Sequence, residues 1–326
     1  MFPRCLQFVF ALVIAGLAVS ATVSSATAQS YPTHQVRMLI PFPPGGSNDV
    51  AGRILAAALT QKWGQTVFVD NRAGAGGTIG TEVASKTAPD GYTLLVVSSA
   101  YPVSPALYKL NYDQDKAFVP VARFAAGAGV LSVNPKVPAK NVQEFLALDK
   151  AKPGSLNFAS AGIGSFEHLA EALFKLQTHS DFVIVQYKGG GPALSDLLGG
   201  QVQAQIGSLI QTTVHIQANE LRALAVTGSK RISALPNVPT VAESGVPGFE
   251  AVNWWGVVAI TGTPQAIVTK VHDDINAVAT TKEMHDKLEK IGAEPAPMTI
   301  AEFGDFIAKE TVRWAQVVKE AHISLQ

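Results

Sequence analysis

One stretch of the sequence decides the fold: Pro41-Phe42-Pro43-Pro44-Gly45-Gly46-Ser47-Asn48-Asp49. The apolar segment 36–40 before it reads as a strand, and residues 50–62 after it carry apolar side chains at helical spacing. The stretch is therefore a turn that leads into a helix, which Ser47, Asn48 or Asp49 can cap. Its two glycines let a ligand approach the backbone. Because the free amides of a helix N-terminus attract anions, the stretch predicts a site for a small anion.

The same order of strand, loop and helix recurs along the chain. Strands expected at 66–70 and 92–97 lead into a glycine-rich loop at 71–80 and into Ser98-Ser99. Later glycine loops at 161–165 and 187–192 follow strands expected at 156–159 and 182–185. This alternation indicates parallel α/β sheets, in which ligands bind beyond the carboxyl ends of the strands. Tight-turn geometry explains each loop alone. Three of the loops, which contain Gly45-Gly46, Gly162 with Gly164, and Gly189-Gly190-Gly191, belong to two units and together predict one shared anion site.

The chain has 326 residues, which suggests two domains or one large one. An α/β unit, a second α/β unit and a return to the first predict two lobes with a cleft. We expect a signal peptide at 1–28, a first lobe formed by 29–130 and 225–326, and a second lobe formed by 131–224. A formal net charge of zero, with 15% charged residues, argues against a nucleic-acid partner.

The N-terminus has the features of an exported protein. Arg4 supplies a positive charge, residues 8–19 form a short apolar run, and Ala26-Thr27-Ala28 fits the cleavage rule. The mature chain is then expected to start at Gln29, and the run is short for a membrane anchor. The only cysteine, Cys5, precedes the apolar run, so the mature chain lacks thiols and fits an oxidising periplasm.

The sequence gives weak support for catalysis. Ile79 stands where a dinucleotide fingerprint requires its third glycine, and the sequence contains no P-loop, nucleophile elbow or metal-binding histidine spacing. We therefore expect no enzymatic activity, no cofactor and no metal. Two alternatives stay open: an exported hydrolase that uses Ser165 or Ser99, and a periplasmic partner of a sensor kinase. His168, one helical turn beyond Ser165, could line the cleft or simply pack.

Motifs along the whole mature chain carry a family resemblance. They are Pro41-Phe42-Pro43-Pro44-Gly45-Gly46, Asn71-Arg72-Ala73-Gly74-Ala75-Gly76-Gly77, Ala88-Pro89-Asp90-Gly91-Tyr92-Thr93-Leu94, Tyr187-Lys188-Gly189-Gly190-Gly191-Pro192, Leu198-Gly199-Gly200-Gln201-Val202 and Val238-Pro239-Thr240-Val241-Ala242-Glu243. In this order they resemble the Bug family, the TctC-like periplasmic solute-binding receptors of tripartite tricarboxylate transporters. The resemblance implies a type II periplasmic-binding-protein fold, with two α/β lobes joined by strand hinges around a ligand cleft. It also implies a monomer that is not an enzyme and that hands its ligand to membrane permease subunits.

The resemblance further implies that loop amides and ordered water grip one carboxylate of the ligand. In the first lobe it implicates Gly45, Gly46, Ser47 and Asp49. In the second lobe it implicates Ala161, Gly162, Gly164, Ser165 and His168, with Lys188 and Gly189 nearby.

Two segments depart from the pattern of the family, Val103-Ser104 and 208–213. Both are expected at the far end of the ligand, so the identity of the ligand is not predicted. Ser99, Ser208 and Thr212 could bind a second polar group there. The aromatic residues Phe42, Tyr101 and Trp254 could flank a flat ligand or pack between the lobes. The sequence thus predicts a receptor for a small mono- or dicarboxylate, aliphatic or aromatic.

Overall fold

The computed structural model describes residues 31–325. The signal peptide and cleavage site expected at 1–28 lie outside the described residues. From His34 onward the chain forms one compact unit. Within the described part of the chain, no helix combines the length and the apolar character that a membrane span requires.

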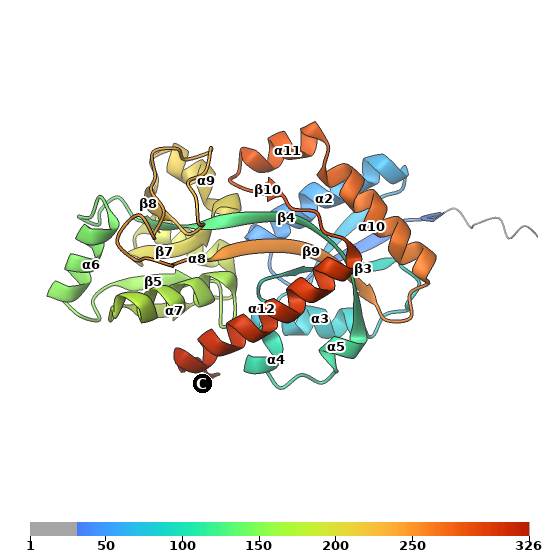
Figure 1. Ribbon diagram of the computed structural model, residues 1–326, viewed down its shortest axis with the longest axis horizontal. Coiled ribbons are helices and arrows are strands. Elements are labelled where there is room, and N and C mark those ends of the chain that lie inside the picture. Colours follow the sequence, from blue (N-terminus) through green and yellow to red (C-terminus); the bar gives the residue numbers. More distant parts are fainter. Residues whose placement is uncertain (1–30, 326) are drawn as a thin grey trace, which may run out of the picture. The chain divides into compact units, whose positions relative to one another are not determined.

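The strands form two lobes, which share one strand (Figure 1). Elements of the first lobe are β1 (Val36–Ile40), α2 (Ser47–Trp63), β2 (Val67–Asn71), η1 (Ala75–Gly77), α3 (Thr78–Ser85), β3 (Thr93–Ser98), α4 (Ser104–Leu107) and α5 (Gln114–Ala117). The shared strand is β4 (Phe118–Val133). Elements of the second lobe are α6 (Val142–Ala151), β5 (Asn157–Ser160), α7 (Phe166–Thr178), β6 (Val183–Gln186), α8 (Gly190–Gly199), β7 (Ala204–Ser208), α9 (Leu209–Gln217) and β8 (Arg222–Val226). The chain then continues through β9 (Val252–Ile260), α10 (Gln265–Ala279), α11 (Lys282–Glu289), β10 (Glu294–Pro295) and α12 (Ile300–Glu320).

The strands follow the order β2-β1-β3-β9-β4-β7-β5-β6, and β8 and β10 pair with β4 off this path. β1 is parallel to β2 and β3, as the alternation of strands and helices predicts. β9, however, is antiparallel to both β3 and β4, so the expectation of wholly parallel sheets is wrong. β4 leads into the second lobe and β9 returns from it. These two paired strands therefore run in opposite directions. The two-lobed α/β fold itself is confirmed, whereas the residue limits of the lobes stay a prediction.

β4 is a single strand of 16 residues. Its first part pairs with β9 and its last five residues pair with β7 (Figure 1). Small residues in the middle allow close neighbours. A Cβ at Gly127 would lie 3.0 Å from the carbonyl oxygen of Gly292, and one at Gly129 would lie 2.9 Å from the ring of Phe166. The same small residues weaken the apolar pattern by which a strand is recognised from sequence.

Each lobe has its own apolar core, and α12 contributes to both. In the first lobe Phe303 of α12 packs with Leu95 and Trp254. In the second lobe Trp314 of α12 joins a cluster of aromatic rings, in which Phe158 and Phe182 stack with their centroids 4.0 Å apart. Since burial of aromatic side chains contributes strongly to stability, α12 is a structural link between the lobes.

The starts of the helices decide which backbone amides stay free. Ser165 caps α7, and Thr299 and Glu302 form a capping box at the start of α12. For α2, the expectation of a side-chain cap from Ser47, Asn48 or Asp49 is wrong, because the N-cap residue is Gly46 and no side chain caps the helix. The first turn of α2 therefore keeps amides that no cap satisfies.

Candidate ligand-binding site

A small closed cavity lies between the two lobes at the carboxyl ends of their strands. From the first lobe it is lined by Phe42, Gly46, Ser47, Asn48, Ser98 and Ala100. The second lobe contributes Ala161, Ser165, Phe166, Glu167 and Gly190, and Asn253 of β9 completes the wall. The cavity measures about 10 Å³, roughly the room that one water molecule needs. An organic ligand of several carbon atoms therefore requires the lobes to move apart or to close less tightly.

Direct contacts between the lobes hold this closed arrangement. The amide of Ser47 donates a hydrogen bond to Oε1 of Gln211 in the second lobe, at 3.0 Å. The Tyr108 hydroxyl donates to the carbonyl oxygen of Ile163, at 2.8 Å. The two glycine loops also touch, since a Cβ at Gly189 would overlap the ring of Pro43. The loop at 41–47 of the first lobe and the loop at 189–191 of the second lobe are thus in direct contact.

The start of α2 presents free hydrogen-bond donors to the cavity. The amide of Gly45 donates to Oδ2 of Asp49, and that of Ser47 donates to Gln211. The amides of Gly46, Asn48 and Asp49 have no partner among residues 34–325. Because the helix dipole adds a partial positive charge at this end, the arrangement favours an anionic group.

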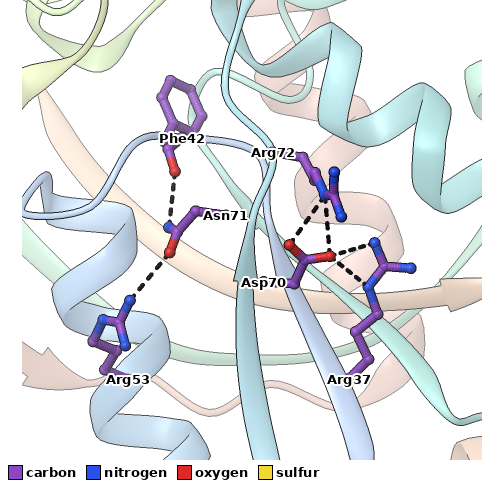
Figure 2. A network of polar contacts seen from close by, with 6 residues as sticks. All are labelled: Arg37, Phe42, Arg53, Asp70, Asn71 and Arg72. Carbon is purple, nitrogen blue, oxygen red and sulfur yellow. Dashed lines mark hydrogen bonds and ion pairs between the residues drawn. The ribbon is translucent and has the colours of Figure 1, made fainter.

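A polar network behind this loop fixes its shape (Figure 2). Asn71 donates to the carbonyl oxygen of Phe42 at 2.9 Å, and Arg53 donates to Oδ1 of Asn71 at 3.1 Å. In the same view Asp70 accepts from both Arg37 and Arg72, which anchors the end of β2 beside β1. The loop is therefore held in place before any ligand binds.

Asp49 belongs to this supporting network. Burial alone would raise the pKa of its carboxyl, but hydrogen bonds from Arg53, the Gly45 amide and Asn71 outweigh burial and lower the pKa. Asp49 is thus a carboxylate whose acceptors are already used by the protein. It shapes the loop, while Gly46 and Asn48, which carry two of the three free amides, line the cavity.

The second lobe uses most of its expected donors internally. The amide of Gly164 donates to Nδ1 of His168, that of His168 donates to Oγ of Ser165, and that of Ser165 donates to the carbonyl oxygen of Gly162. Burial lowers the pKa of His168 to about 4, so the ring is neutral at physiological pH. Of the residues expected here, Ala161 and Ser165 line the cavity.

The remaining predicted residues lie around the cavity, not on its wall. The Ser99 hydroxyl donates to Oδ1 of Asn253 at 2.8 Å, directly behind the wall. Ser208 is fully buried and its Oγ has no partner, while Thr212 donates to the Ser208 carbonyl oxygen. Lys188 is exposed. The small polar residues thus form a layer outside the wall.

The predicted aromatic residues take different places. Phe42 lines the cavity. Tyr101 packs edge-on against Phe118, and burial raises the pKa of its hydroxyl. Trp254 donates from Nε1 to Glu310 and lines a separate groove of about 630 Å³. Of the three, only Phe42 is placed to touch a ligand in the closed arrangement.

Sequence reasoning missed Glu167 and Asn253. Glu167 is only 4% exposed and lines the cavity from the first turn of α7. Burial raises the pKa of its carboxyl to about 7, against weaker opposing hydrogen bonds from its own amide and from Ser165. Its position two residues after the N-cap of a helix that starts at the cleft is the signal that could have found it. Asn253 is the second residue of the apolar strand β9 and carries no comparable signal.

Within the described residues, the two serines considered as nucleophiles lack a histidine base. The Ser165 hydroxyl lies 3.5 Å from that of Ser160 and accepts from a backbone amide. The Ser99 hydroxyl donates to Asn253. In the described part of the chain, neither hydroxyl is bonded to a histidine ring, which a serine nucleophile requires for activation.

Two α/β lobes that close on a cavity lined by loop amides define the class of two-lobed solute-binding proteins. Residues 51–323 match the model of the tripartite tricarboxylate transporter family receptor, TctC. The chain belongs to this family. It is 40% identical to Protein BugT of Bordetella pertussis over 321 residues, which cover 98% of both chains.

Solved structures agree with this assignment. The structure of R. palustris Rpa4515 with adipate superposes with a TM-score of 0.88 at 35% identity, covering 90% of this chain and 99% of that one. The structure of MatC (Rpa3494) from Rhodopseudomonas palustris with bound malate has a TM-score of 0.81 at 30% identity, covering 88% and 100%. Both levels of identity support a shared fold and family.

Proposed function

We propose that this chain is a periplasmic receptor that captures a small organic carboxylate by closing its lobes. It passes the ligand to the membrane subunits of a tripartite transporter and does not transform it. Membership of the TctC family supports the transport role. The adipate and malate in the related structures support a carboxylate as the ligand.

The observation that carries this proposal is the set of unpaired amides of Gly46, Asn48 and Asp49 at the start of α2. Each hydrogen bond to a charged group contributes about 1.5–3 kcal/mol, so three contribute about 4.5–9 kcal/mol. Micromolar binding corresponds to about 8 kcal/mol. The amides can therefore hold one carboxylate without an arginine.

A thermal-shift screen of mono- and dicarboxylates tests the proposal. A ligand at 100 times its Kd stabilises the folded state by about 2.7 kcal/mol, which raises the Tm of a chain of this size by roughly 5 °C. The expected result is a saturable rise in Tm with the ligand recovered unchanged by NMR. Absence of any stabilisation, or conversion of the ligand, would refute a carboxylate receptor.

A substitution at Gly46 locates the site. The backbone of Gly46 is extended, and a Cβ there would meet only the Pro43 carbonyl oxygen at 3.7 Å and the Gly190 amide at 3.9 Å. Gly46→Val should therefore fold, with a Tm within a few degrees of wild type, but its methyl groups should fill the cavity and abolish binding. Gly199→Val, at an exposed end of α8, is the matched control and should bind normally. Unchanged affinity of Gly46→Val would place the carboxylate elsewhere.

A further inference from the structure

The cavity wall contains one ionisable side chain, Glu167. The other lining side chains are neutral, and no lysine, arginine or histidine is among them. Arg53, in the second turn of α2, is already paired with Asp49. A second carboxylate on a ligand would therefore meet an acid in this cavity and no countercharge.

The wall also contains an acceptor that no donor of the protein satisfies. Oδ1 of Asn48 is buried without a hydrogen-bond partner, and Asn48 as a whole is 8% exposed. Asn48 comes from α2 and Glu167 from α7, so the two acceptors belong to opposite lobes. A buried acceptor without a donor destabilises the folded protein, because it has lost its hydrogen bonds to water. A ligand group that donates several hydrogen bonds would remove this cost.

A neighbouring buried acid, Glu171, stands behind the cavity wall and adds no charge to it. Glu171 lies one turn along α7 and is fully buried; one of its carboxylate oxygens accepts from the Ile206 amide and the other has no partner. Burial raises the pKa of Glu171 well above its ordinary value, and the charge of Glu167 raises it further. The raised pKa favours the protonated, neutral form of Glu171, so the negative charge offered to a ligand is that of Glu167.

We propose that the ligand carries an ammonium group in addition to its carboxylate. The carboxylate lies at the free amides of α2, and the ammonium group donates to Glu167 and to Oδ1 of Asn48. The ligand is then a zwitterion, an amino acid in the broad chemical sense, and not a dicarboxylate. This inference rests on the proposed function, because it assumes that the cavity is the carboxylate site.

Matched ligand pairs test the inference by isothermal titration calorimetry. Adipate and 6-aminohexanoate differ in one end group, and so do glutarate and 5-aminopentanoate. In at least one pair the amino compound should bind wild type at least tenfold more tightly than its dicarboxylate partner.

The variant Glu167→Gln keeps the shape of the side chain and removes its charge. It should lose at least tenfold in affinity for the preferred amino compound and should not lose affinity for the dicarboxylate. Glu171→Gln is the matched control, since it neutralises a buried acid of the same helix that does not line the cavity. It should keep the preference of wild type.

The outcomes separate this inference from the proposed function. If wild type binds dicarboxylates as tightly as their amino partners, or if Glu167→Gln keeps the amino preference, the inference is overturned while the carboxylate receptor stands. If wild type binds no compound of either kind, the proposed function fails as well. The comparison within wild type needs no variant, so a folding defect in Glu167→Gln cannot decide it.

Discussion

At the scale of single residues, two carboxyl groups at helix starts have opposite surroundings. Asp49 accepts from Arg53, from Asn71 and from the Gly45 amide, and these bonds outweigh burial and lower its pKa. Glu167 has no basic partner in the described part of the chain, and burial raises its pKa to about 7. A helix N-terminus favours the charged form of both. The difference therefore comes from the donors around Asp49, Arg53 among them; Glu167 has no cationic partner among the described residues and can receive a ligand cation.

The raised pKa of Glu167 predicts how ligand affinity depends on pH. An ammonium ligand requires the ionised carboxylate of Glu167. Below pH 7 most molecules of the free protein carry a proton on this carboxyl and must release it before the ligand binds. With a pKa of about 7, affinity should fall about tenfold from pH 8 to pH 6. Nearby on α7, His168 has a pKa of about 4 and stays neutral over this range, and the strongly raised pKa of Glu171 favours its protonated form.

Calorimetry of the preferred amino compound at pH 6, 7 and 8 measures this dependence. In Glu167→Gln the affinity should be weak and independent of pH. A flat profile in wild type would show that Glu167 does not change its charge when the ligand binds.

At the scale of elements, local patterns predicted the loops, whereas long-range pairing did not follow from them. Glycine loops between strands and helices pointed to Gly46 and Ser165, and both line the cavity. Nothing near Ser47 in the sequence signals that its amide donates to Gln211, which lies 164 residues away. Glu167 was missed because an acid in the first turn of a helix is ordinary for an exposed helix start; only the tertiary fold shows that it is buried.

The direction of strands was equally hidden from the sequence. The apolar run of β9 looks the same whether its neighbours are parallel or antiparallel, and Gly127 and Gly129 interrupted the pattern of β4. Lobe architecture was predictable because it follows from the order of elements, and because the motifs resemble a known family. The composition of the cavity wall was predictable only in part, since it depends on which loops meet.

The start of α8 gives a test of how these loops meet. Gly189 has a φ of +123°, and a Cβ there would overlap Pro43 of the opposite lobe. Gly189→Ala should therefore oppose closure by about 1–3 kcal/mol, as overpacking does, and weaken ligand binding about tenfold or more. Calorimetry with the carboxylate found in the thermal screen measures this loss.

The matched control is Gly248→Ala, which has a φ of +77° and no atom near its added Cβ. Both variants should lose about 1–2 kcal/mol of stability through backbone strain, but the control should bind normally. Equal affinities in the two variants would mean that contact between Gly189 and Pro43 does not take part in ligand capture.

At the scale of the whole molecule, binding depends on the balance between open and closed lobes. β4 and β9 connect the lobes, and α12 packs into both cores. The closed arrangement leaves a cavity of about 10 Å³, too small for an organic ligand, so the lobes must open for one to enter. Apparent affinity then includes the fraction of molecules that can close around the ligand.

The bond from the Tyr108 hydroxyl to the Ile163 carbonyl oxygen joins the two lobes away from the cavity wall. Tyr108→Phe removes one hydrogen bond, about 0.5–1.5 kcal/mol, from the closed state only, so affinity should fall about two- to tenfold. Small-angle X-ray scattering should show a larger mean radius at subsaturating ligand. Tyr112→Phe is the control, because its hydroxyl faces Gln114 within the first lobe, and it should change neither quantity. If Tyr108→Phe matches wild type in both measurements, this bond does not stabilise the closed state, and the link between closure and affinity must lie in the contacts of Ser47 with Gln211 and of Pro43 with Gly189.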